Sequence, residues 1–197
     1  MKRIVIATKN SGKAKEFKAF FSEKNMEAVS LLDIEKDLPD VEETGETFEE
    51  NAELKAEEIS RILGIPVLSD DSGLVIDALG GRPGIYSARY AGEDKDDRAN
   101  INKVLQELEG IPEHQRTARF VCVLAVSRPG EETIFKKGYC EGLIASTPSG
   151  DYGFGYDPIF IPKGYKKTMA ELGPEEKNRI SHRKNAMVEL EDWIDSL

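Results

Sequence analysis

The stretch from Lys2 to Phe17, KRIVIATKNSGKAKEF, contains the unit that decides the fold. Lys2 to Thr8 is centred on the run RIVIA and predicts a buried strand. An amphipathic helix follows, and its apolar side is formed by Ala14, Phe17, Phe20 and Phe21. A strand that leads through a tight turn into a helix is typical of the opening unit of an α/β fold.

Strands and helices keep alternating through the first half of the chain, and the third quarter is rich in strands. The sequence predicts two long antiparallel strands, 117–127 and 132–145, joined as a hairpin. The other predicted elements are strands at 28–32, 65–69, 74–76 and 158–161, and helices at 47–63, 94–108 and from Ser181 onward. We therefore expect a single domain over residues 1–197, with a mixed, twisted sheet flanked by helices and two lobes around a central cleft for the ligand.

Composition excludes several classes of protein. The chain has 197 residues, of which 39% are apolar, so it can bury a core. No apolar run approaches the roughly 18 residues of a membrane span, which favours a soluble, cytoplasmic protein with no membrane partner. The two cysteines, Cys122 and Cys140, read as small buried side chains in a reducing compartment. A net charge of -10 argues against binding to a nucleic-acid backbone but leaves room for a small phosphate-bearing metabolite.

The turn between the first strand and the first helix is a candidate anion site. The N–H groups at the start of a helix, together with its dipole, attract phosphate, and Lys13 would add a charge. The residues in question are Thr8, Lys9, Asn10, Ser11, Gly12 and Lys13. They do not match a Walker A loop, so a helix-capping turn with a solvated lysine is an equal alternative.

Two pairs of adjacent carboxylates are candidate Mg²⁺ ligands. The segments Glu42 to Gly45 and Asp70 to Gly73 both read as turns, and Mg²⁺ prefers hard oxygen ligands beside a phosphate. Each turn taken singly is better explained as a solvated acidic turn, because the whole chain is acidic. A buried strand that ends directly on Asp70 and Asp71 favours the functional interpretation, because α/β proteins commonly bind ligands where strands end.

Lys55 falls on or beside the buried stripe of the predicted helix 47–63, and Asn51 lies one turn earlier on the same side. A lysine there can extend its ammonium to the surface along an apolar face. The functional alternative is an ammonium that faces the carboxylates and positions a water or a phosphate.

The segment Gly153 to Asp157 places Phe154 between two glycines, where an exposed ring would stack on a nucleobase; a tight turn is the alternative. Near the C-terminus, Ser181 reads as a helix N-cap, and His182 and Arg183 follow in the first turn. Because the helix dipole disfavours cations there, we expect an anionic or electron-rich partner for them.

Taken together, these motifs resemble the inosine/xanthosine triphosphate pyrophosphatase family (ITPase-like) over nearly the whole chain. The motifs are residues 8–13, 42–45, 47–52, 70–73, LGGRPGIYSARY at 79–90, FGYD at 154–157 and SHR at 181–183. Their order and spacing are more specific than any single one. The resemblance implies an elongated α/β fold, a homodimer, and Mg²⁺-dependent release of pyrophosphate from ITP, dITP and XTP, an activity that cleanses the nucleotide pool.

The resemblance also implies roles for individual residues. Residues 8–13 would hold the triphosphate, with Lys13 as the charged contact, and Glu42 and Asp71 would bind the metal. Asp71 also matches the presumed general base, and Lys55 completes the catalytic set. The expected substrate contacts are Ser72, Phe154, Gly155, Tyr156 and Asp157, with Lys177, His182 and Arg183 for the base.

Three other functions remain open at this point. A nucleotidyl or phosphoryl transferase would also use a phosphate turn and acidic metal ligands. The related septum-inhibition family has a similar fold, but the pairing of SHR at 181–183 with FGYD at 154–157 argues against it. The third is a non-catalytic nucleotide sensor, and intact carboxylates at Glu42 and Asp71 argue against it.

Overall fold

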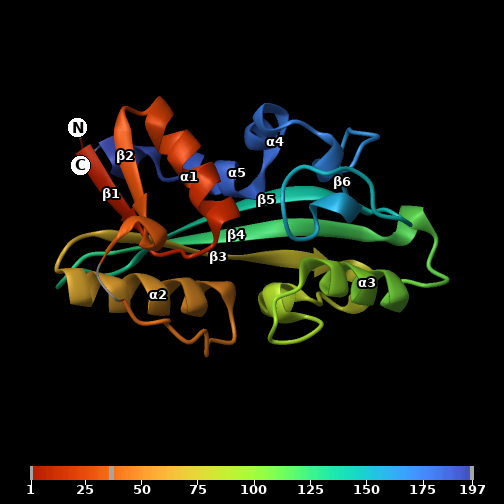
Figure 1. Cartoon of the computed structure of the whole chain (residues 1–197), viewed down its shortest axis with the longest axis horizontal. Coiled ribbons are helices and arrows are strands. Elements are labelled where there is room, and N and C mark those ends of the chain that lie inside the picture. The colour runs from red at the N-terminus through yellow and green to blue at the C-terminus, as the bar shows by residue number, and fades with distance from the viewer. Residues whose placement is uncertain (1, 36–37, 196–197) are drawn as a thin grey trace. The chain divides into compact units, whose positions relative to one another are not determined.

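The computed structural model describes residues 2–35 and 38–195 (Figure 1). The strands are β1 (Lys2–Ile6), β2 (Met26–Ser30), β3 (Val67–Ile76), β4 (Thr117–Ser127), β5 (Ile134–Ile144) and β6 (Phe160–Pro162). They form one sheet in the order β2-β1-β3-β4-β5-β6. Strand β1 pairs in parallel with β2 and β3, whereas β5 and β6 are antiparallel, so the sheet is mixed.

The α-helices of the described residues are α1 (Ser11–Glu23), α2 (Phe48–Leu63), α3 (Asp97–Glu107), α4 (Pro174–Ile180), α5 (His182–Val188) and α6 (Glu191–Asp195). The prediction of a mixed α/β fold with helices flanking a sheet is confirmed. No helix within residues 2–35 and 38–195 is long and apolar enough to cross a membrane.

The chain divides into two compact units, each built from separate segments. Unit 1 comprises Met1–Asp71, Cys122–Gly138 and Arg183–Leu197, and unit 2 comprises Ser72–Val121 and Tyr139–His182. The predicted single domain and the predicted central cleft stay predictions.

In unit 1, helices α1 and α2 lie on opposite sides of strand β3 (Figure 1). Side chains alternate between the two faces of a strand, and β3 follows this rule. Leu68 packs in the cluster that contains Phe17 of α1, whereas its neighbour Val67 packs with Ile59 of α2. The two faces of the strand therefore meet different helices.

Strand β3 corrects one prediction. The sequence predicted a turn at Asp70-Asp71-Ser72-Gly73 between two short strands, but a single strand runs through it from Val67 to Ile76. Aspartate, serine and glycine favour turns when local preference decides. Here burial decides instead, because nearly every residue of the strand is buried, including both aspartates.

The predicted helix 47–63 agrees with α2 to within one residue. Thr47 is the N-cap, and its hydroxyl accepts the N–H of Glu50, while Gly64 ends the helix in the left-handed conformation at φ 70°. A loop over residues 38–45, the acidic loop, precedes this helix and contains the predicted turn at 42–45.

Unit 2 has its own apolar core, and the sequence missed one of its helices. The core includes Val104 of α3, Phe120 of β4 and Phe160 of β6. Helix α4 begins at Pro174, directly before the predicted final helix. That final helix is interrupted, because α5 ends at Val188 and α6 begins at Glu191.

Candidate active site

The predicted phosphate turn joins β1 to α1 in unit 1. Thr8 is buried, and its hydroxyl accepts the N–H of Asn10 at 3.2 Å. Asn10 is the N-cap of α1, and its Oδ1 accepts the N–H of Lys13 at 3.0 Å. Ser11 and Gly12 form the start of the helix. The turn therefore brings the start of a 13-residue helix and Lys13 together, as an anion site requires.

Lys9 takes a different direction from Lys13. Its Nζ lies 2.6 Å from Oδ1 of Asp40 and 3.3 Å from the carbonyl oxygen of Leu38. Asp40 belongs to the acidic loop, so Lys9 ties the phosphate turn to that loop. The predicted contact of Lys9 with a triphosphate stays a prediction.

A buried ionic network lies on the α1 face of β3. Nζ of Lys13 lies 2.9 Å from Oδ2 of Asp70, and Nε of Arg183 lies 3.4 Å from the same oxygen. The guanidinium of Arg183 also donates to Oε2 of Glu16, which lies one turn after Lys13 on α1. Two carboxylates and two cations therefore balance one another on this face.

The charges in this network shift the pKa of each central member. Burial by itself would raise the pKa of Asp70, but the positive charges of Lys13 and Arg183 outweigh it and hold the pKa well below its usual range. Burial opposes the charge of Arg183, yet Glu16 and Asp70 raise its pKa. Both groups stay ionised at neutral pH, so Asp70 is a poor acceptor for a proton.

A second group lies on the α2 face of the same strand. Nζ of Lys55 lies 2.5 Å from Oε1 of Glu43 and 3.7 Å from Oδ1 of Asp71. The side chain of Lys55 is 13% exposed and that of Asp71 is 7% exposed. Because consecutive strand residues point to opposite faces, Asp71 is separated from Asp70 by the strand itself.

Asp71 differs from Asp70 in its affinity for a proton. Burial raises the pKa of Asp71 to about 6, and the charges of Lys55 and Lys13 only partly oppose this rise. Burial lowers the pKa of Lys55, but the charges of Asp71 and Glu43 outweigh it and the pKa is raised. A carboxylate with a pKa close to neutrality is suited to accept a proton from water.

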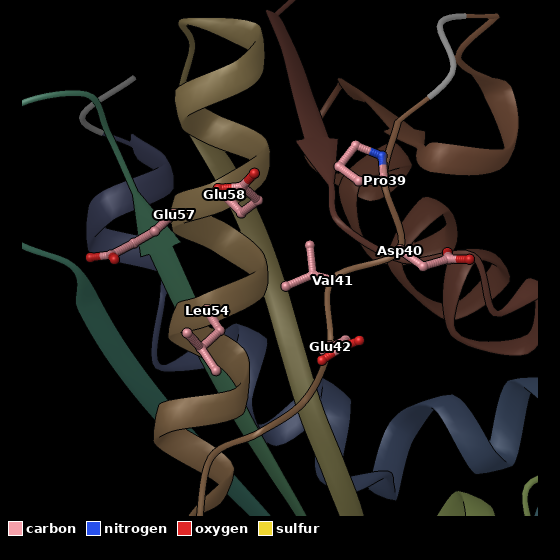
Figure 2. Close-up of a pocket in the computed structure, with 7 residues that line it drawn as sticks. All are labelled: Pro39, Asp40, Val41, Glu42, Leu54, Glu57 and Glu58. Carbon is pink, nitrogen blue, oxygen red and sulfur yellow. The ribbon is translucent and has the colours of Figure 1, made fainter.

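Glu42 lies beside a surface pocket of about 340 Å³ between the acidic loop and α2. Figure 2 shows Val41 pointing toward α2 and the carboxylate of Asp40 pointing away from it. Glu42 is exposed, whereas Glu43 is partly buried and bound to Lys55. The loop thus presents one carboxylate to solvent and the next toward the Asp71 face.

The carboxylates of unit 1 fit Mg²⁺ in their chemistry. Mg²⁺ is usually bound by one or two carboxylates, with water and substrate phosphates as the other ligands. Within the part of the chain that the structure describes, no group of three or more histidine, cysteine, aspartate or glutamate side chains is arranged to hold a metal. Carboxylate oxygens are hard ligands of this kind, and the assignment of Glu42 and Asp71 as the ligands stays a prediction.

Unit 2 holds the predicted aromatic motif. Oδ2 of Asp157 accepts the N–H of Phe154 at 3.0 Å and lies 2.7 Å from Nζ of Lys177. That ammonium lies 4.5 Å from the centre of the Phe154 ring, a cation–π contact. Phe154 is half-buried rather than fully exposed. The structure therefore brings Lys177 to the motif that contains Phe154 and Asp157.

The other predicted contacts in unit 2 are also held in place. The N–H of Gly155 donates to Oδ2 of Asp97 at 2.8 Å, and the hydroxyl of Tyr156 donates to the carbonyl oxygen of Ser87 at 2.7 Å. His182 stacks on Phe120, with 4.9 Å between ring centres. Ser72 is half-buried within β3. Their roles in binding a substrate stay predictions.

Sequence reasoning missed Glu16. It lies in a helix among apolar residues, and its one useful signal is its spacing of three residues from Lys13. Its partner Arg183 is 167 residues away, so only the folded chain shows that it belongs to the site.

The chain is similar to known proteins along nearly its whole length. Residues 4–193 match the model of the Ham1 family. The chain is 62% identical over its whole length to the dITP/XTP pyrophosphatase of Oceanobacillus iheyensis, covering all of that protein as well. It is also 57% identical to the dITP/XTP pyrophosphatase of Bacillus subtilis, covering all of this chain and 98% of that protein.

Solved structures give the same result. The Ham1 protein of Staphylococcus aureus has a TM-score of 0.86 at 48% identity and 99% coverage of both chains. A HAM1 protein from Coxiella burnetii has a TM-score of 0.87 at 41% identity and complete coverage of both chains. The resemblance found in the sequence motifs is confirmed, and this chain belongs to the Ham1 family.

Proposed function

We propose that this chain is a Mg²⁺-dependent pyrophosphatase that hydrolyses deaminated purine nucleoside triphosphates (ITP, dITP and XTP) to the monophosphate and pyrophosphate. The observation that carries the proposal is the identity of 62% over the full length of a dITP/XTP pyrophosphatase. The geometry of unit 1 supplies a chemical reason for each part of the reaction.

Asp71 acts as the general base. A water attacks the α-phosphorus, its oxygen forms the new P–O bond, and the bond to the bridging oxygen of the β-phosphate breaks. Asp71 accepts the proton of the water, and burial has raised its pKa to about 6 so that this transfer is favourable near neutral pH. Lys55, 3.7 Å from Oδ1, orients this carboxylate.

Glu42 and Asp71 would hold the metal. Bound there, Mg²⁺ neutralises charge on the triphosphate and on the pyrophosphate that leaves. Lys13 supplies a further positive charge at the start of α1, where the turn from Thr8 binds phosphate oxygens. Release of orthophosphate from the nucleotide would require the attacking water to lie in a different position. The identity of the product therefore tests this arrangement.

Residues of unit 2 recognise the base. Phe154 provides a ring for stacking, and Lys177 and His182 provide donors for the carbonyl at position 6 of a deaminated purine. Adenine has an amino group at that position and would leave these donors without an acceptor, so selectivity follows. The predicted part of Arg183 in this recognition belongs to the same proposal.

The remaining parts of the proposal come from family resemblance: the protein works as a homodimer in the cytoplasm, and its role is to cleanse the nucleotide pool. Size-exclusion chromatography with light scattering measures the first of these directly. A monomer at micromolar concentration would remove the homodimer from the proposal without affecting the reaction.

Product analysis tests the reaction itself. The purified protein is incubated with ITP, XTP, ATP or GTP in Mg²⁺, and pyrophosphate is resolved from orthophosphate. Pyrophosphate and monophosphate released from ITP or XTP, and lost on adding EDTA, would support the proposal. Orthophosphate, or equal rates with ATP and GTP, would contradict it.

A further inference from the structure

Asn51 is a fully buried polar residue in α2 that none of the proposed steps uses. Its Oδ1 accepts the N–H of Gly45 at 2.7 Å, so the asparagine holds the end of the acidic loop from Glu42 to Gly45. The contact is close-packed. A Cβ atom on residue 45 would lie 2.7 Å from that Oδ1 and 2.6 Å from Cβ of Glu50, which leaves room for glycine alone.

Two further contacts attach the same loop to the same helix. Oε2 of Glu50 accepts the N–H of Glu46 at 2.6 Å, and Nζ of Lys55 lies 2.5 Å from Oε1 of Glu43. Glu50 and Lys55 lie one residue before and one turn after Asn51. Helix α2 therefore holds the loop at three successive points, with Asn51 at the centre and fully buried.

The neutral amide of Asn51 suits this position. The loop and its surroundings already contain Glu42, Glu43 and Asp71, and carboxylates that repel one another tend to move apart when no cation is present. An amide oxygen accepts the Gly45 N–H as a carboxylate would, but it adds no negative charge beside Lys55.

The Nδ2 group of the same amide indicates that Asn51 is present for its contact with the loop rather than for its packing. Among the described residues, Nδ2 of Asn51 has no hydrogen-bond partner although it is buried. An unsatisfied buried donor destabilises a fold, and an apolar side chain of similar size, such as leucine, would avoid that penalty. The chain instead has a residue that can bind the loop.

We propose that Asn51 is a positioning residue for the metal ligand Glu42, because it fixes the acidic loop against α2. The inference rests on the proposed function for the identity of the metal, and on the structure alone for the attachment of the loop. Asn51 does not itself contact the metal, since it is fully buried and its Oδ1 is already occupied by Gly45.

The test uses both ends of the contact. Asn51→Leu removes the acceptor, and Gly45→Ala forces the loop away from it. Both should raise the Mg²⁺ concentration for half-maximal turnover by about tenfold or more, as loss of a group that orients a metal ligand commonly does. At saturating Mg²⁺, kcat and the KM for ITP should stay within about threefold of wild type. The double variant should be no worse than the more affected single variant, because both remove one contact.

Two readouts do not depend on turnover. Hydrogen exchange should show a protected Gly45 amide in the metal-free wild type and an unprotected one in Asn51→Leu. The rise in Tm on adding Mg²⁺ in the presence of pyrophosphate should shrink in both variants. Asn51→Asp keeps the acceptor and should retain the protection of Gly45, which gives a conservative variant if Asn51→Leu does not fold.

The matched control is Ser60→Ala. Ser60 is also buried in α2, and its hydroxyl donates to the carbonyl oxygen of Ile65 at 2.7 Å, far along the helix from the loop. This variant should lose stability yet keep the wild-type Mg²⁺ requirement. The proposal would be overturned if Ser60→Ala raised the Mg²⁺ requirement equally. It would also be overturned if Asn51→Leu kept the wild-type Mg²⁺ requirement and a protected Gly45 amide. Failure of wild type to hydrolyse ITP would defeat the proposed function instead, and the hydrogen-exchange result would still decide the attachment.

Discussion

Asp70 and Asp71 are consecutive residues of one buried strand, yet they have opposite electrostatic surroundings. On the α1 face, Asp70 and Glu16 are balanced by Lys13 and Arg183, and the pKa of Asp70 is held low. On the α2 face, Nζ of Lys55 lies close to both Asp71 and Glu43, and burial raises the pKa of Asp71 to about 6.

The contrast between these two surroundings indicates which carboxylate is available for chemistry. A buried carboxylate with two cationic partners is already stabilised in its charged form, and it gains little from a proton or a metal. For Asp71, burial outweighs the positive charge of Lys55 and destabilises the ionised form, so this carboxylate gains from a proton or from a metal. We therefore propose a structural role for Asp70 and a role in the reaction for Asp71.

The largest expected effect is the loss of turnover in Asp71→Asn. We expect kcat/KM for ITP to fall by about 10³-fold or more, because the proton acceptor and a metal ligand are lost together. Nucleotide binding should persist, and it is measured by equilibrium titration in parallel with steady-state kinetics. Turnover close to wild type would remove Asp71 from the reaction.

Asp70→Asn should act on stability instead. Removing one member of a buried ionic network leaves Lys13 and Arg183 without their shared carboxylate, and such changes destabilise folds by about 3–5 kcal/mol. Denaturant unfolding of the metal-free protein measures the loss. If Asp70→Asn were as stable as wild type but inactive, the roles of the two faces would have to be exchanged.

The two faces should also respond oppositely to pH in the metal-free protein. The pKa of Asp71 rises from 3.8 to about 6 on folding, so the folded state binds the proton more tightly. Stability from this group is therefore present below about pH 4, and by linkage about 3 kcal/mol is lost as pH rises to 6. Asp70, with its lowered pKa, contributes stability that is present above pH 3.8 and lost only in stronger acid.

Unfolding curves in EDTA between pH 4 and 7 measure this component. The free energy of unfolding should lose the pH dependence caused by Asp71 in the Asp71→Asn variant. The Asp70→Asn variant should keep that pH dependence. A wild-type slope in Asp71→Asn would assign the titration to a different group.

The smallest expected effect concerns Arg183, whose guanidinium contacts Glu16 and Asp70. Arg183→Lys keeps the positive charge for both carboxylates but removes the forked set of donors. If Arg183 also reads the base, the preference for ITP over ATP should fall by about tenfold, as loss of one polar discrimination contact would produce. An unchanged ratio of kcat/KM values would confine Arg183 to the ionic network.

Much of this fold was readable from the sequence. Apolar periodicity predicted α1, α2 and α3, and the predicted bounds 47–63 agree with α2 to within one residue. Strand β3 was misjudged at Asp70 to Gly73, because turn preference is local whereas the burial that overrides it comes from two helices. Helix α4 had a readable signal in Gly173-Pro174-Glu175-Glu176, since proline in the first turn followed by acids favours a helix start.

The sequence predicted individual residues of the candidate site but not how these residues are grouped in space. The motifs named Lys13, Lys55 and Asp71, but adjacent aspartates look equivalent in a sequence. Their separation follows from the alternation of strand side chains, and it became visible once β3 was continuous. Glu16 acts through Arg183, which lies 167 residues away, so only the folded chain shows its place in the site. Asn51 belongs to the motif at 47–52, but its contact with Gly45 became visible only in the structure.

The most direct test of the account is the analysis of products from ITP and XTP by wild type, Asp71→Asn and Asp70→Asn in the presence of Mg²⁺. The account predicts pyrophosphate and monophosphate from wild type, reduced yet measurable amounts from folded Asp70→Asn, and almost none from Asp71→Asn. Orthophosphate from wild type, or full activity in Asp71→Asn beside a well-folded and inactive Asp70→Asn, would contradict it.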